Sequence, residues 1–190
     1  MKKRLLVSTL LAAALLRGSL PVCAQQDAGA LAVILNHYAA RDFVAGAIPD
    51  ADIELIVQAG IRAPSARNLQ PWYFTVVQNP VLAKKIVSNN LDGNVLIAVS
   101  APGDGKTNNV QILDCALAVQ SVYLAAQALG YGSRIYTGPI DNLNRNFKGE
   151  LSLPNGYSAV ALVRVGKIKP DAVSSASARK RATDLVTHKK

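Results

Sequence analysis

The sequence feature that most constrains the fold is the long, alanine-rich apolar segment from Asn108 to Leu129. It ends at Gly130, a residue that favours the C-terminal cap of a helix. Small side chains in such number let neighbouring backbones approach closely: Ala116, Ala118, Ala125, Ala126 and Ala128. The segment predicts one long helix that lies at the centre of the domain, is buried on most sides and takes part in a subunit contact.

Shorter helices and strands alternate around this segment. Val95 to Ser100 and Ala159 to Val165 are apolar almost throughout, which predicts strands buried on both faces. Two further strands are predicted over 72–78 and 134–137, and helices over 29–39, from Pro49 to before Pro64, 81–89 and 142–151. The pattern predicts a single α+β domain of the three-layer sandwich type. With only about four strands, a second copy of the chain is expected to complete the core.

The first 24 residues have the features of a secretory signal peptide. A basic start at residues 1–4 precedes an apolar run over 5–16, and Val22-Cys23-Ala24 forms a plausible cleavage site. We therefore predict export, most simply to a periplasm, with a mature domain over 25–190 and a polar arm from about residue 167. A lipid-modified Cys23 is the alternative, which the bulky Val22 before it disfavours.

Composition excludes several classes of protein. Half of the residues are hydrophobic and 17% are charged, so the chain is expected to fold. Loss of the signal peptide removes four basic residues and no acid, which lowers the formal net charge from +9 to +5 and gives little support for nucleic-acid binding. No mature segment has the ~20 consecutive apolar residues of a membrane span. Two histidines and one mature cysteine provide no metal-site spacing.

One loop resembles a nucleotide-binding motif only in part. The segment Gly103-Asp104-Gly105-Lys106-Thr107 lies between a strand and a helix, as a P-loop does. However, Ser100 stands where the first glycine is required, and Pro102 interrupts the loop. We predict a solvated loop rather than a phosphate cradle. We also predict that Cys115, which lies among alanines in the long helix, is a buried small hydrophobe.

The segment that carries most information on function is the loop Ala63-Pro64-Ser65-Ala66-Arg67-Asn68-Leu69-Gln70-Pro71-Trp72. Two prolines fix its path, and between them stand a hydroxyl, a guanidinium and two carboxamides. A stiff loop whose groups both donate and accept hydrogen bonds suits a flat heterocycle with a polar edge. The alternative, which composition alone favours, is an ordinary connection in which Ser65 and Asn68 bond their own backbone.

This loop resembles the A-P-S-x-x-N-x-Q-P-W signature of the nitroreductase family of flavoproteins. Other family motifs are matched in order along the mature chain, by Arg41-Asp42-Phe43, Asp114-Cys115-Ala116, residues 125–133, Tyr136-Thr137-Gly138, Leu153-Pro154-Asn155-Gly156-Tyr157 and Arg179-Lys180. The resemblance implies a nitroreductase-like fold, with a small, mainly antiparallel central sheet flanked by helices. It also implies a homodimer with two FMN sites at the interface, each built from both subunits.

The resemblance further implies an FMN-dependent oxidoreductase. NAD(P)H would reduce the flavin, which would then reduce a nitroaromatic, quinone or similar small aromatic acceptor, with no catalytic side chain because the chemistry belongs to the flavin. Arg41 and Arg179 would meet the FMN phosphate, and the backbone of Thr137 and Gly138 would lie near the ring. Carried over position by position, the implied cofactor-binding residues are His37, Arg41, Pro64, Ser65, Ala66, Asn68, Thr137, Gly138 and Arg179.

The chain departs from the family pattern at the phosphate end of the implied site. Two arginines and a serine of the family's first motif fall on His37, Tyr38 and Ala39, and a tail lysine falls on Ser177. A charged hydrogen bond contributes ~1.5–3 kcal/mol, so losing two or three would weaken FMN binding by about two orders of magnitude or more. The alternative function is a catalytically degenerate protein that binds flavin or another planar ligand without turnover. A third is a divergent activity on free flavin, a peptide or a ring.

Overall fold

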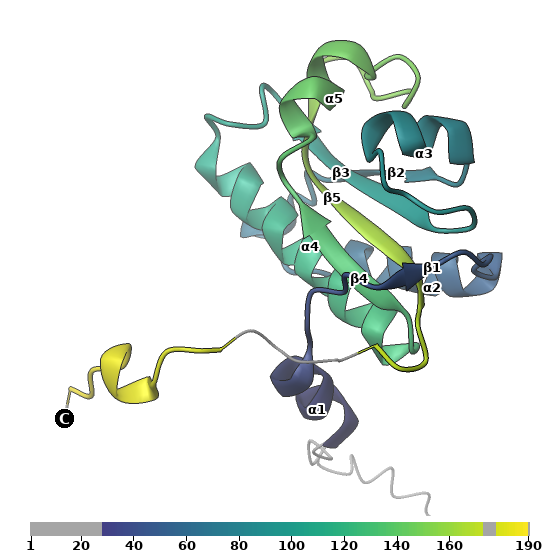
Figure 1. Ribbon diagram of the computed structural model, residues 1–190. Coiled ribbons are helices and arrows are strands. Elements are labelled where there is room, and N and C mark those ends of the chain that lie inside the picture. Colours follow the sequence, from purple (N-terminus) through teal and green to yellow (C-terminus); the bar gives the residue numbers. More distant parts are fainter. Residues whose placement is uncertain (1–27, 173–177, 190) are drawn as a thin grey trace, which may run out of the picture.

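The computed structural model describes residues 28–172 and 178–189 (Figure 1). The predicted signal peptide and Ser177 lie outside the described residues. The helices are α1 (Ala28–Asn36), α2 (Asp50–Ile61), α3 (Pro80–Ile86), α4 (Asn109–Ala128) and α5 (Ile140–Asn146). The strands are β1 (Phe43–Val44), β2 (Tyr73–Val77), β3 (Val95–Pro102), β4 (Gly132–Tyr136) and β5 (Tyr157–Ile168). Short 3₁₀ turns cover Ala66–Asn68 and Ala182–Asp184.

The five strands form one antiparallel sheet in the order β1-β5-β3-β2, with β4 also paired to β5. The long strand β5 therefore pairs with three strands, β1, β3 and β4, and the segment that carries β1 also contacts residues 92–94, just before β3. Strand β1 is the element that the sequence did not predict, because two residues are too few for a periodic pattern to show. Strand β5 continues through Ile168, which pairs with Phe43, so the polar tail begins just beyond this pair.

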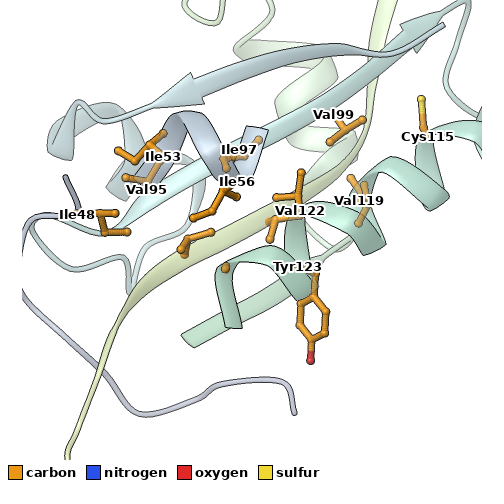
Figure 2. Close-up of a cluster of buried hydrophobic side chains, with 14 of the residues drawn as sticks. Ile48, Ile53, Ile56, Val95, Ile97, Val99, Cys115, Val119, Val122 and Tyr123 are labelled. Atoms are coloured by element: carbon orange, nitrogen blue, oxygen red, sulfur yellow. The ribbon is translucent and has the colours of Figure 1, made fainter. Parts of the chain in front are cut away.

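Helices cover both faces of the sheet and make three layers. Val95, Ile97 and Val99 of β3 point toward α2 and α4 and join the larger hydrophobic cluster (Figure 2). Leu96 and Ala98 point to the opposite face and join a second cluster with α3 and α5. An apolar residue at every position of β3 but Ser100 is thus explained by burial on both faces, as the sequence predicted.

Helix α4 is central but is buried along one face only. Its buried side chains include Cys115, Val119 and Val122, which pack against the sheet. The opposite face leaves Leu113 64% and Leu117 44% exposed. The prediction of burial on most sides is therefore wrong for the single subunit. By length and mean hydropathy α4 is the one helix in the described part of the chain that could cross a membrane, and here it is the core helix of the domain.

Some boundaries differ from those predicted. Helix α1 ends at Asn36 rather than at Ala39, and α5 covers 140–146 rather than 142–151. Most of residues 178–189 lie apart from the rest of the domain (Figure 1), and all of them are exposed. They include Leu185 and Val186, which are 65% and 53% exposed.

Candidate flavin site

The loop that follows α2 has an unusual backbone. Pro64 disfavours helical geometry at the residue before it, and α2 ends at Ile61. Three residues without glycine's freedom then adopt left-handed conformations, with φ values of 53° at Arg67, 56° at Asn68 and 47° at Gln70. Such conformations cost about 1–3 kcal/mol each and persist only where the surrounding structure imposes them, often at functional sites.

Hydrogen bonds within the loop impose this shape. The backbone N–H of Gln70 donates to Ser65 Oγ at 3.0 Å, and the N–H of Asn68 donates to the Ser65 carbonyl at 3.0 Å. Gln70 Nε2 donates to Asn68 Oδ1 at 3.1 Å. Ser65 therefore bonds its own loop, as the alternative interpretation of this segment expected. Asn68 and Gln70 nonetheless remain exposed, so both carboxamides can also reach a ligand.

The loop is attached to the domain through α4. Asp114 Oδ1 accepts a hydrogen bond from the backbone N–H of Ala66 at 3.0 Å. Asp114 is only 4% exposed. Sequence reasoning assigned it no catalytic role, although it is the one charged residue of α4. Pro64 and Ala66 are exposed, while Pro71 is buried and closes the loop against the domain.

A second group of predicted residues gathers near the C-terminal end of α4. Gln127 Nε2 donates to the Tyr38 carbonyl at 3.0 Å and to Ser133 Oγ at 2.9 Å, while Gln127 Oε1 accepts from the Tyr38 N–H at 3.2 Å. The His37 ring stands edge-on to the Tyr123 ring, with centroids 5.5 Å apart. Gln127 thus fixes the backbone beside His37, a role that sequence reasoning missed.

This group borders a hollow with unused polar atoms. A groove of about 320 Å³ is lined by Ala32, Val33, Asn36, His37, Tyr38 and Gln127. His37 Nδ1 and the Tyr38 hydroxyl are buried and have no hydrogen-bond partner among the described residues. Burial, and then Asp42, raise the pKa of Tyr38. Both side chains line the groove, and each keeps a polar atom that no described residue pairs with.

Two arginines complete the predicted phosphate end. Arg41 is exposed, and it follows Ala40, whose N–H donates to the Ser133 carbonyl at 3.0 Å. Arg179 is also exposed, and its charge acts on Tyr123, lowering a pKa that burial raises. His37 and Arg179 therefore both lie within electrostatic reach of Tyr123.

Thr137 and Gly138 form the third predicted part of the site. They follow β4 and are exposed, and the Thr137 carbonyl accepts from the Ile140 N–H at 3.2 Å, which begins α5. Apart from Gly138 and its two chain neighbours, no atom of the described residues lies within 4 Å of where a Cβ on Gly138 would stand. The backbone at this turn is open to a ligand.

One subunit does not bring all these residues together. At a rise of about 1.5 Å per residue, Asp114 and Gln127 are separated by about 20 Å along α4. Ser65 and Asn68 lie near the first of these positions, whereas His37 lies near the second. The subunit thus presents two half-sites at different levels of one helix.

The motifs set aside in the sequence prove to be structural. Asp104 Oδ1 accepts from the backbone N–H groups of Lys106 and Thr107, at 2.8 and 2.9 Å, and these bonds lower the pKa of Asp104. The loop over residues 103–107 is solvated, as predicted, and its own Asp104 carboxylate already accepts hydrogen bonds from two of its backbone N–H groups. Burial, and then Asp114, raise the pKa of Cys115 to about 12, so this thiol stays protonated. Within 28–172 and 178–189 no His, Cys, Asp and Glu side chains cluster as a metal site would require.

Known structures share this architecture. A nitroreductase with bound FMN from Desulfitobacterium hafniense DCB-2 aligns with a TM-score of 0.72 at 23% identity, over 85% of this chain and 98% of that one. A structure from Desulfovibrio desulfuricans, assigned to the nitroreductases and in complex with FMN, aligns with a TM-score of 0.70 at 26% identity, over 85% and 96% of the two chains. The predicted nitroreductase-like α+β fold is confirmed.

Sequence comparison agrees with the fold. A protein from Archaeoglobus fulgidus, with an inferred NADH dehydrogenase/NAD(P)H nitroreductase assignment, is 30% identical over 151 residues, which are 74% of this chain and 86% of that protein. The profile described as "Nitroreductase family" matches residues 34–95 and 88–167. These matches span every strand and most helices of the domain, and the chain belongs to the nitroreductase family.

Proposed function

We propose that this protein is an FMN-dependent oxidoreductase that acts as a homodimer and passes electrons from NAD(P)H to nitroaromatic, quinone or similar small aromatic acceptors. The observation that carries the proposal is the exposed loop over residues 64–70. Its backbone is strained, hydrogen bonds within the loop hold its shape, and Asp114 attaches it to α4, so the carboxamides of Asn68 and Gln70 are held in fixed positions. The FMN bound in the D. desulfuricans structure and the assignment of the A. fulgidus relative support the cofactor and the electron donor.

The residues present fit FMN at both ends. At the phosphate end, the unused His37 Nδ1 and Tyr38 hydroxyl stand with the guanidinium of Arg179 near Tyr123. At the ring end, the turn at Thr137 and Gly138 leaves open space beside its backbone. Arginine is suited to a phosphate because its planar fork can bind two oxygens at once.

The bound flavin would supply hydride and electron transfer. The residues of this chain would bind and orient it. Arg41 and Arg179 would hold the phosphate, and the backbone at Thr137 and Gly138 would donate to the ring edge, where a neutral donor stabilises negative charge without supplying a competing acid. Pro64, Ser65, Ala66 and Asn68 would cover the ring from the other subunit and exclude water.

A second subunit is supported by exposed apolar surface. Leu31, Ile34 and Leu35 of α1 are 55%, 53% and 70% exposed, and Leu113 and Leu117 of α4 add to them. An apolar groove of about 510 Å³ also runs between α1, α2 and α4. Exposed apolar side chains beside an apolar groove are typical of an interface between proteins. Pairing through α4 would also unite half-sites that lie about 20 Å apart in one subunit.

The test is spectroscopic. Purified protein should be yellow or become yellow with FMN, should bleach with NADH or NADPH without oxygen, and should sediment as a dimer. Arg41→Ala and Arg179→Ala should weaken FMN binding by about tenfold or more, as expected for a charged hydrogen bond, and riboflavin binding much less. Equal losses for both ligands would show that neither arginine contacts the phosphate.

The second candidate is a protein that binds flavin without turnover. It is favoured by the phosphate end, where His37, Tyr38 and Ala39 replace two cations and a hydroxyl of the family pattern. Yellow protein that neither nicotinamide reduces would support it.

We also propose export through residues 1–24, since a basic start and an apolar run precede the domain. A mature protein that begins at Gln25, identified by mass spectrometry of a periplasmic fraction, is the expected result.

A further inference from the structure

Asp114 is a buried carboxylate in a helix face that is otherwise built to be apolar. Its neighbours on the buried face are Cys115, Ala118, Val119, Val122, Tyr123 and Ala126. Its Oδ1 accepts the Ala66 N–H at 3.0 Å, and its Oδ2 is buried with no hydrogen-bond partner among the described residues. A buried charge with one partner is a costly arrangement that an apolar side chain would avoid. A role beyond packing is therefore required to explain it.

The role follows from where the hydrogen bond falls. Within residues 63–70, the bonds made by Ser65, Asn68 and Gln70 stay inside the turn, so they shape it without attaching it to the domain. The bond from Ala66 to Asp114 is the one side-chain hydrogen bond that joins this turn to the remainder of the described chain. It crosses 48 positions in sequence and fixes the strained turn to the central helix.

We infer that Asp114 is a positioning residue for the flavin. By accepting the hydrogen bond from the Ala66 N–H, it fixes the position of the loop along α4. This position determines where Ser65 and Asn68 would contact the flavin ring across the subunit interface. A carboxylate suits this task because a charged acceptor makes a shorter and stronger hydrogen bond than a neutral one. The inference rests on the proposed function, and it names a residue that never touches the ligand.

Two substitutions separate positioning from stability. Asp114→Leu keeps the branched shape and the number of side-chain heavy atoms and removes the acceptor, and because an apolar replacement of a buried charge is often neutral or stabilising, the protein should keep its Tm. Asp114→Asn keeps a carbonyl oxygen for the Ala66 N–H. The thiol of the neighbouring Cys115 donates to the Ser100 carbonyl at 3.9 Å rather than to the loop, so Cys115→Ala serves as the control.

The measurements are amide hydrogen exchange in a peptide covering 63–70 and FMN affinity from quenching of flavin fluorescence. Asp114→Leu should raise both the exchange rate and the FMN Kd by about tenfold, as expected for loss of one charged hydrogen bond. Asp114→Asn should stay within about threefold of wild type on both readouts. Cys115→Ala should change neither. If Asp114→Leu does not fold, Ala66→Pro removes the donor instead, since proline is tolerated at the first position of a turn and after the extended Ser65.

Three results would overturn the inference. Asp114→Leu could exchange as slowly as wild type, which would mean that the loop is not tethered. It could exchange faster yet bind FMN equally well, which would mean that the tether does not serve the ligand. Asp114→Asn could fail as badly as Asp114→Leu with a lowered Tm, which would mean a structural role. Wild-type protein that never binds FMN would refute the proposed function itself. In the three results above the wild type binds FMN and only the variants depart from expectation, so they would refute the role of Asp114 alone.

Discussion

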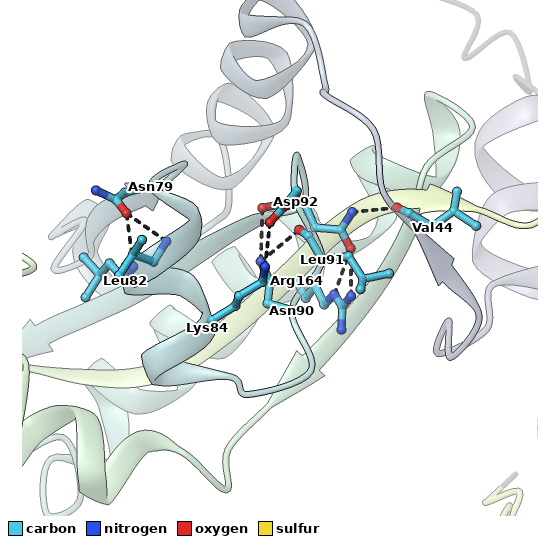
Figure 3. Close-up of polar contacts among 10 residues, drawn as sticks. Val44, Asn79, Leu82, Lys84, Asn90, Leu91, Asp92 and Arg164 are labelled. Atoms are coloured by element: carbon cyan, nitrogen blue, oxygen red, sulfur yellow. Dashed lines mark hydrogen bonds and ion pairs between the residues drawn. The ribbon is translucent and has the colours of Figure 1, made fainter.

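Replacing Asn94 with alanine tests how the fold holds the segment that carries Arg41. Arg164, in the middle of β5, is 2% exposed, and its Nε and Nη2 donate to Asn94 Oδ1 at 3.1 and 2.8 Å. Asn94 Nδ2 in turn donates to the Val44 carbonyl at 2.9 Å (Figure 3). The guanidinium also lies 4.1 Å from the centre of the Phe43 ring. Burial lowers the pKa of Arg164, the direction expected when a cation is removed from water.

The expected loss of stability follows from these contacts. Asn94→Ala removes two charge-assisted bonds to one oxygen, worth about 1.5–3 kcal/mol each, and one neutral bond worth about 0.5–1.5 kcal/mol. Because the two charged bonds share an acceptor, we expect a total of about 3–5 kcal/mol, which is typical of leaving a buried charge without its partner. For a domain of this size the Tm should fall by roughly 6–20 °C.

Thermal unfolding followed by circular dichroism measures the effect, and Asn89→Ala is the matched control. Asn89 Oδ1 accepts from the same guanidinium at 3.4 Å, but the residue is exposed, so its loss should cost less than about 1 kcal/mol. Asn94→Ala should also weaken FMN more than riboflavin, because β1 lies just after Arg41. A Tm that matches the Asn89→Ala control would refute the argument that Asn94 supplies the acceptor that a buried guanidinium requires.

Three further changes are predicted. Leu113→Glu places a charge on the exposed apolar face of α4 and should shift the protein to a monomer in sedimentation, and an intact dimer would contradict the proposed interface. Cys115, whose pKa is raised to about 12 by burial, should resist iodoacetamide at pH 8 until urea unfolds the protein, whereas rapid native alkylation would contradict its burial. The hydrogen bond to Asp52 raises the pKa of Tyr131 from 10.0 to about 12, so its stabilisation is complete below pH 10 and lost as the pH rises through 12. Tyr131→Phe should flatten the fall of Tm in this range, and an unchanged slope would exclude the bond as its cause.

The sequence predicts the layers of this fold because burial leaves a strong local pattern. β3 and β5 are apolar at nearly every position, which only burial on both faces explains. The mistake about α4 has the same origin. Leu113 and Leu117 are as apolar as buried residues. Sequence alone cannot distinguish an apolar side chain that packs in the core from one that stays exposed on the surface of the subunit.

The site is less accessible to sequence reasoning than the fold. The prolines around Ser65 indicate a stiff loop, yet nothing local indicates that Arg67, Asn68 and Gln70 are left-handed. Asp114 is visible as an acid on an apolar helix, but its partner lies 48 positions away and only the tertiary structure shows it. The roles of Gln127 and Asn94 were missed for the same reason.

The position of β5 in the chain has a consequence for how this protein is made. β5 pairs with three other strands, and each of those three precedes it in sequence. A growing chain that has not yet synthesised residue 168 therefore lacks the strand that joins β1, β3 and β4. The sheet is therefore completed late, from contacts distant in sequence, and until then one edge of the apolar β3 lacks its partner strand, an arrangement that favours aggregation.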